Sequence, residues 1–256
     1  SQLPNGVSML LKKNKVDYKH GLAKIISAEQ VEVNGEHIST KKVLISTGSQ
    51  VATVPNVNID EKNIVSSTGA LEFNKVPKRL AVIGGGYIGL ELGSVWNRLG
   101  SEVTVIEFSS TIVPMMDEDT ANVFYKTLIK QGVKFLLDTK VESAGMEKSG
   151  IKLKCLSLKD NKNIESVYDK VLVAVGRKPF TTGLGIDSLG VSINKQGAIL
   201  VDENDSEYEN DKLIQSKYFT SNKDKLPIDG KIRIRSMFCH SFEKMPQNEY
   251  TIYSFA

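Results

Sequence analysis

The sequence contains little cysteine, no long apolar run and no excess of charge of one sign. Its two cysteines among 256 residues, Cys155 and Cys239, lie far apart, which argues against a disulfide framework and is typical of a reducing compartment. No apolar stretch approaches the roughly 20 residues that a membrane-spanning helix needs, and we expect no signal peptide. With 33 basic and 30 acidic residues, the chain offers no strong positive field to nucleic acid or to an anionic membrane.

Several catalytic and metal-binding motifs are also missing. There is no metal-ligand spacing, no nucleophile elbow and no phosphate-loop lysine motif, so we assign neither a metal site nor a catalytic residue. His240 has Glu243 three residues later but lacks any surrounding motif. The two cysteines have no partner at a redox spacing, and we interpret both as ordinary thiols.

Residues 79–107 carry the most informative pattern that is present. Residues 80–83 form a short apolar run, which predicts a strand buried on both faces. Gly84, Gly86 and Gly89 follow as G-x-G-x-x-G, where the strand must turn into a helix. The first glycine allows the tight turn, the second the approach of a pyrophosphate, and the third close packing of helix on strand. The alternative is a parallel α/β unit whose glycines serve packing only.

An acid ends the strand that follows this helix. Glu107 lies 21 residues after Gly86, where a carboxylate can accept hydrogen bonds from the adenosine ribose and repel a 2′-phosphate. The amides at the helix start, with the positive end of the helix dipole, would bind the pyrophosphate. The sequence therefore predicts NAD, rather than NADP, as the ligand.

The rest of the chain predicts an α/β protein. We expect a hairpin turn at Asn34-Gly35 between strands, and a connector of little periodicity over residues 51–75. Residues 117–131 predict an amphipathic helix that ends before Gly132. Strands are expected over residues 18–26, 30–33, 42–45, 133–137 and 171–175, and an antiparallel meander over residues 141–146, 151–158 and 164–167. The composition changes after Val201, and residues 202–256 predict a poorly packed or unrelated tail.

These patterns together resemble the pyridine-nucleotide disulfide oxidoreductases, and within them the dihydrolipoamide dehydrogenases. The segments that carry the resemblance are NIVSSTGAL (63–71), GGGYIGLELGSVWNRLGSEVTVIEF (84–108), KQGVKF (130–135), DTKV (138–141) and VAVGRKPFTTGLGIDSLGV (173–191). The resemblance implies a Rossmann-like three-layer ββα fold, with a complete NAD domain inserted in a partial FAD domain. Residues 1–75 would be FAD domain, 76–176 NAD domain, 177–201 the return to the FAD domain and 202–256 an unmatched tail.

The resemblance also implies a set of cofactor-binding residues. Some have an equally plain structural interpretation: Tyr87 and Val141 as packing residues, Glu91 as an acid favoured by the helix dipole, and Thr47-Gly48 as an ordinary turn. The NAD set is Gly84, Gly85, Gly86, Tyr87, Ile88, Gly89, Leu90, Glu91, Glu107, Val141 and Gly176, and the FAD set is Ala23, Thr47, Gly48 and Ser49.

Other parts of that family's chemistry are not found in this sequence. The family's C-x-x-x-x-C redox pair, first FAD fingerprint, Gly-Asp motif and H-P-T-x-x-E base are absent. Because the chain also starts at Ser1 rather than Met, we expect a segment of a dihydrolipoamide dehydrogenase that binds NAD without catalysis. FAD, a homodimer and the 2-oxo acid dehydrogenase complex belong to the full-length family member, in bacterial cytoplasm or the mitochondrial matrix. The alternatives are a non-catalytic NAD-binding or interaction module, and a sibling flavin disulfide reductase or NADH oxidase.

Overall fold

The computed structural model describes residues 2–200 and 251–253. Their contacts form two compact units, one of Ser1–Gln50 with Lys178–Ala256 and one of Val51–Arg177. The predictions for residues 202–256, and for Cys239, His240 and Glu243, lie outside the described residues except at Thr251–Tyr253. Among the described residues, no helix has both the length and the apolar character to cross a bilayer.

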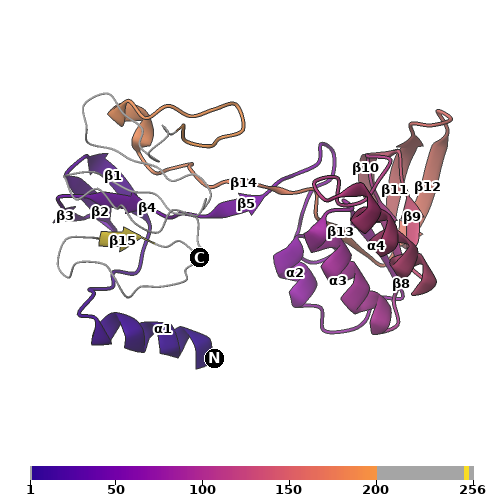
Figure 1. Cartoon of the computed structure of the whole chain (residues 1–256), viewed down its shortest axis with the longest axis horizontal. Helices are drawn as coiled ribbons and strands as arrows, with labels where there is room; N and C mark the ends of the chain where they lie inside the picture. The colour runs from indigo at the N-terminus through magenta and orange to yellow at the C-terminus, as the bar shows by residue number, and fades with distance from the viewer. Residues whose placement is uncertain (1, 201–250, 254–256) are drawn as a thin grey trace. The chain divides into compact units, whose positions relative to one another are not determined.

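A five-stranded parallel sheet forms the centre of the unit Val51–Arg177 (Figure 1). Its strand order is β6-β13-β7-β8-β9. The strands are β6 (Ile64–Val65), β7 (Arg79–Ile83), β8 (Glu102–Ile106), β9 (Lys134–Leu136) and β13 (Lys170–Val173). Both faces of a parallel sheet must be covered, which explains why these strands are almost continuously apolar.

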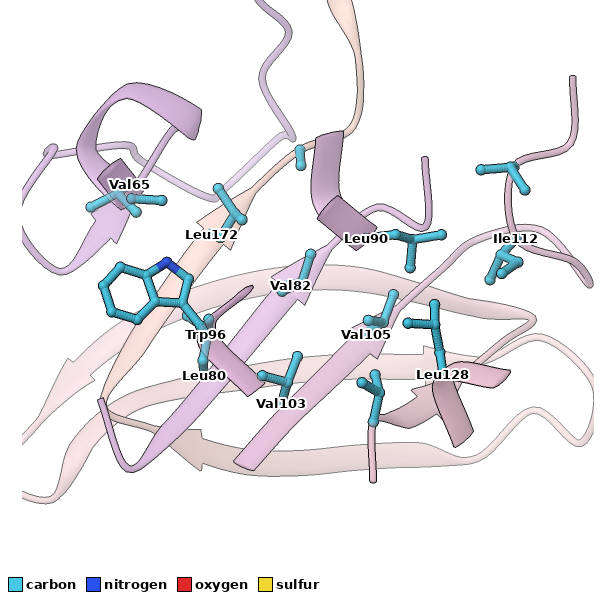
Figure 2. Packing of buried hydrophobic residues seen from close by; sticks show 14 of the residues in the cluster. Val65, Leu80, Val82, Leu90, Trp96, Val103, Val105, Ile112, Leu128 and Leu172 are labelled. Atoms are coloured by element: carbon cyan, nitrogen blue, oxygen red, sulfur yellow. The ribbon is translucent and has the colours of Figure 1, made fainter. Parts of the chain in front are cut away.

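Helices cover one face of this sheet. They are α2 (Ser67–Leu71), α3 (Tyr87–Arg98) and α4 (Glu118–Lys130). Figure 2 shows side chains of this layer, with Leu90 and Trp96 of α3 and Leu128 of α4 packed with Leu80, Val82, Val103, Val105 and Leu172 of the strands. These strand residues are the ones whose side chains point to the helical face.

An antiparallel meander covers the opposite face. It comprises β10 (Thr139–Glu147), β11 (Gly150–Ser157) and β12 (Asn163–Tyr168). The alternate strand residues Ala81, Ile83, Val171 and Val173 pack there against buried Ile151 and Leu153. The period of two along β7 and β13 thus divides one sheet between two cores, and the unit has the predicted meander–sheet–helix layers.

The helix expected over residues 117–131 is confirmed with its ends. The Asp117 side chain accepts a hydrogen bond from the Thr120 amide at 3.1 Å and caps α4, and Glu118 and Asp119 occupy the first turn. The helix ends at Lys130, and Gly132 takes φ 93° just beyond it.

The interpretation of residues 51–75 as a connector is wrong in part. These residues include β6, which pairs with β13, and α2, whose N-cap Ser66 accepts from the Thr68 amide at 3.1 Å. Elements of two and five residues are too short to show a period, so pattern analysis missed them. The compact units divide after Gln50.

The other unit contains a three-stranded antiparallel sheet of β1 (Ala23–Ser27), β2 (Gln30–Val33) and β3 (Glu36–Ser39). The predicted hairpin turn is present, with Asn34 at φ 52° and Gly35 at φ 85°. The first strand starts at Ala23 and not at residue 18, because the chain bends at Gly21. The remaining elements are α1 (Gln2–Lys13), β4 (Val43–Ile45), η1 (Ile186–Leu189) and β15 (Thr251–Tyr253), and β15 pairs in parallel with β4.

Two short strands lie where the chain passes from one unit to the other. They are β5 (Ser49–Val51) and β14 (Arg177–Pro179), and they pair with each other. The core of the unit that contains residues 1–50 is formed by Ile25, Val31, Val43 and Ile45 of its strands, with Leu184 and Ile186 of the returning chain.

Candidate functional site

The glycine-rich turn lies between β7 and α3, as the sequence predicts. Gly84 has φ 108°, and its amide donates to the Ile106 carbonyl oxygen at 2.9 Å. A Cβ on Gly84 would overlap the Ala174 carbonyl, and a Cβ on Gly89 would overlap the Gly84 carbonyl. The first and third glycines of the motif are therefore required for packing.

The second glycine has a different environment. Gly86 is the N-cap of α3, with φ −78° and ψ 175°, a backbone conformation open to any residue. Nothing lies within 4 Å of a Cβ built there. The N-cap residue provides no side chain to cap the first-turn amides of α3, which lie at the positive end of the helix dipole. This arrangement suits an anion, and neither packing nor backbone conformation explains the glycine.

Glu107 lies at the end of β8 and contacts the same turn. Its Oε2 accepts a hydrogen bond from the Gly85 amide at 2.5 Å, and its Oε1 accepts from the Ser109 amide at 2.8 Å. The sequence predicted a carboxylate available to a ribose, and it did not predict that the same group holds the glycine turn. A carboxylate has about four acceptor positions, so two remain for hydroxyl groups.

The remaining residues predicted for NAD differ in exposure. Tyr87 is 72% exposed and Glu91 is also exposed, whereas Leu90 is buried in the core. Ile88 is half-buried and packs on that core. The Leu90 side chain therefore serves packing, and the Ile88 side chain does so in part.

Val141 and Gly176 lie on other elements of the same unit. Val141 is a buried residue of β10 and belongs to the core on the meander face. Gly176 is exposed and has φ 118°, and its carbonyl accepts from the Ala52 amide at 3.0 Å. Nothing lies within 4 Å of a Cβ on Gly176, so its backbone is accessible.

The residues predicted for FAD lie in the other unit. Thr47 is buried, and its hydroxyl donates to the Phe180 carbonyl at 2.5 Å. Gly48 has φ 67°, and its carbonyl accepts from the Phe180 amide at 3.1 Å. Ser49 begins β5, and Ala23 begins β1 and lines a small hollow together with Thr47. Thr47 and Gly48 thus hold the returning chain, a role that their sequence pattern did not indicate.

Cys155 lies on β11 in the core on the meander face, away from the glycine turn in sequence. Burial raises the pKa of the Cys155 thiol to about 11, which makes it a poor nucleophile near neutral pH. Within residues 2–200 and 251–253, no three His, Cys, Asp or Glu side chains come together as metal ligands would.

A parallel sheet, a glycine turn at one strand end and an acid at the next define a Rossmann-like α/β protein. The family model for pyridine nucleotide-disulphide oxidoreductases matches residues 1–208. The chain belongs to that family, which comprises FAD-containing, NAD(P)-dependent flavoprotein oxidoreductases.

The chain is similar to several curated relatives and solved structures. It is 49% identical over 208 residues to the mitochondrial dihydrolipoyl dehydrogenase of Pisum sativum, covering 79% of this chain and 42% of the relative. A leghemoglobin reductase of Glycine max is 49% identical, with 79% and 40% covered, and the mitochondrial dihydrolipoyl dehydrogenase of Schizosaccharomyces pombe is 44% identical, with 80% and 41% covered.

Among solved structures, the HOCl-induced flavoprotein disulfide reductase RclA of Escherichia coli superposes with a TM-score of 0.67 at 31% identity. The match covers 80% of this chain and 48% of that one. The chain therefore spans about two-fifths of the length of the curated relatives it matches.

Proposed function

We propose that this chain binds NAD at the β7–α3 turn and corresponds to the NAD-binding part of a dihydrolipoamide dehydrogenase. The observation that supports this most directly is Gly86, the N-cap of α3, which provides no side chain and would have nothing within 4 Å of a Cβ. Neither packing nor backbone conformation requires a glycine there, whereas close approach of a pyrophosphate does.

The residues of this chain fit the dinucleotide as follows. The first-turn amides of α3 bind the pyrophosphate, and the free acceptor positions of Glu107 take the adenosine ribose hydroxyls. The Glu107 charge repels a 2′-phosphate, which favours NAD over NADP. Exposed Tyr87 and Glu91 lie on the first turns of α3, and Gly176 and Val141 supply a backbone wall and an apolar wall. When bound, NAD accepts a hydride.

The fit to FAD is partial. Ala23 and Thr47 share one hollow, and the Gly48–Ser49 turn follows, but the Thr47 hydroxyl and Gly48 carbonyl already bond to Phe180. The sequence contains neither the first FAD fingerprint nor the C-x-x-x-x-C pair. We therefore derive no step through the flavin, and propose that the chain alone does not oxidise dihydrolipoamide.

The identities favour dihydrolipoamide dehydrogenase as the source of this sequence over a sibling reductase. Relatives named dihydrolipoyl dehydrogenase reach 49% identity, as does a leghemoglobin reductase, whereas the flavoprotein disulfide reductase RclA reaches 31%. The relatives above that carry this name are also named mitochondrial, which supports the mitochondrial matrix over the bacterial cytoplasm. Association with a 2-oxo acid dehydrogenase complex, and dimerisation, would follow for a full-length protein.

Two measurements test this proposal. Titration calorimetry of the purified chain should give one NAD site, with NADP binding at least tenfold more weakly. No heat at millimolar NAD would contradict the binding site. Dihydrolipoamide-dependent formation of NADH should be absent, and turnover at the rates of a full-length dehydrogenase would contradict the non-catalytic assignment.

A further inference from the structure

The turn after β8 contains a strained residue. Val113 has φ 40°, in the left-handed region that β-branched residues rarely adopt. It also precedes Pro114, and a residue before proline is normally extended. Both local preferences therefore oppose the observed backbone of Val113, so other contacts must hold it.

Three contacts impose this conformation. The Val113 side chain is 6% exposed and belongs to the core between sheet and helices, next to fully buried Ile112. Figure 2 shows Ile112 in the same cluster as Leu90 of α3. The Val113 carbonyl accepts from the Met116 amide at 2.8 Å, and the Val113 amide donates to the Gly85 carbonyl at 2.9 Å.

Gly85 is consequently held at both of its peptide groups. Glu107 accepts its N–H at 2.5 Å, and Val113 donates to its C=O at 2.9 Å. The peptide that contains the Gly85 C=O also contains the Gly86 N–H. Because a trans peptide is planar, these two groups point in opposite directions. Fixing the Gly85 C=O therefore also fixes the direction of the Gly86 N–H, at the uncapped start of α3.

We propose that Val113 is a positioning residue of the dinucleotide site. Its left-handed backbone brings its amide to the Gly85 carbonyl, and this contact aims the Gly86 amide at the pyrophosphate position before the ligand arrives. The inference rests on the proposed NAD site. Val113 itself contributes no ligand contact, and it acts only through Gly85.

Two substitutions at the same position separate the backbone conformation from the side chain. Val113→Ala removes the buried methyl groups that hold the turn but leaves a residue that disfavours φ 40°. Val113→Gly removes still more of the side chain but accepts the left-handed conformation without penalty. Because Val113→Gly loses more packing than Val113→Ala, tighter NAD binding by the glycine variant would report the backbone conformation. Ile112→Val is a matched control that trims the neighbouring core residue outside the left-handed turn.

We expect Val113→Ala to weaken NAD binding about fivefold in calorimetry, the order of the penalty for a left-handed L-residue. Val113→Gly should recover at least half of that loss, although it is the larger truncation, and Ile112→Val should bind as the unmodified chain does. Unchanged affinity in Val113→Ala, or Val113→Gly binding no better than Val113→Ala, would overturn the proposal.

Amide hydrogen exchange in the unliganded chain distinguishes failure of this inference from failure of the NAD site. The Gly85 and Val113 amides should be protected from exchange without NAD. Protection of the amide at position 113 should fall in Val113→Ala and return in Val113→Gly. Exchange of both amides at unprotected rates would overturn the positioning role even if NAD binds. Protected amides with no NAD binding would instead refute the proposed function, and the inference with it.

Discussion

The three glycines of the turn have different structural roles, which single substitutions can separate. Gly84 and Gly89 lie where a Cβ would overlap backbone carbonyls, whereas Gly86 faces open space in an ordinary backbone conformation. Packing thus accounts for two of the glycines, and neither packing nor backbone conformation accounts for the third. The alternative interpretation, in which the glycines serve only packing, is sufficient for Gly84 and Gly89.

Gly86→Ala should therefore weaken NAD binding and leave the fold intact. The added methyl group lies at the N-cap of α3, where it would hinder the close approach of a pyrophosphate, and we expect a loss of about 1–3 kcal/mol in binding free energy from displaced hydrogen bonds. Calorimetry and thermal melting measure the two effects. Gly145→Ala is the matched control, because Gly145 also has nothing within 4 Å of its Cβ but lies on β10. Equal NAD affinity in Gly86→Ala and Gly145→Ala would count against the site.

Glu107→Gln should reduce both NAD affinity and stability. The glutamine amide retains one acceptor oxygen, so either the Gly85 or the Ser109 amide would face an NH₂ group. An unsatisfied amide costs about 1–3 kcal/mol, and the lost charge should also allow NADP to bind more nearly like NAD. Denaturant unfolding and paired titrations with both nucleotides measure these effects. A variant with unchanged stability would show that the two amide contacts contribute nothing.

The Cys155 thiol should be unreactive in the folded protein. Burial, and to a smaller extent the Glu142 carboxylate, raises its pKa to about 11. A folded pKa above the unfolded value favours the folded state below about pH 9, and this contribution is lost as the pH rises toward 11. Labelling of a Cys239→Ser variant by a chromogenic disulfide reagent at about pH 8 should be slow until denaturant is added. Labelling as fast as in denaturant would contradict this burial.

At the scale of elements, what the sequence predicts depends on the length of each element. The helix around residues 117–131 is long enough to show a period and end signals, and strands such as β7 and β13 are long enough to show an apolar run. β6 and α2, with two and five residues, have neither, and the sequence analysis missed both. In the site, the glycines and Glu107 were predicted from local pattern. The close approach of Gly84 to Ala174 and the hydrogen bond of Gly85 with Val113 were not predicted, because the sequences around Val113 and Ala174 contain no signal of these contacts.

The cap of α4 can be tested on its own. Asp117→Ala removes the acceptor for the Thr120 amide and should lower the free energy of unfolding by about 1 kcal/mol. Asp117→Asn is the control, because asparagine caps a helix as well as aspartate does. Urea unfolding of the two variants decides the matter, and equal losses would assign the effect to the lost charge near the helix dipole.

At the scale of the whole molecule, the unit Val51–Arg177 contains two complete cores. Every residue of the helix-face core, from Val65 to Ala174, and of the meander-face core, from Val57 to Val173, lies within it. Residues 51–75 contribute to both: Val65 and Ala70 pack on the helical side, and Val57 and Ile64 on the meander side. The family-based division after residue 75 would remove these four buried side chains and the edge strand β6.

We therefore expect a polypeptide of Val51–Arg177 to fold cooperatively by itself and to bind NAD with the affinity of the full chain, because Gly84–Gly89, Glu107 and Val113 all lie within it. A polypeptide of residues 76–176 should be several kcal/mol less stable, since each lost large apolar side chain contributes about 1.5–3 kcal/mol. It would also expose the edge of β13 that pairs with β6 in the full chain.

Thermal melting and calorimetry of the two polypeptides measure both effects. Equal melting temperatures would show that residues 51–75 only connect the units, and a well-folded Val51–Arg177 unit that failed to bind NAD while the full chain bound it would place an essential contact outside these residues.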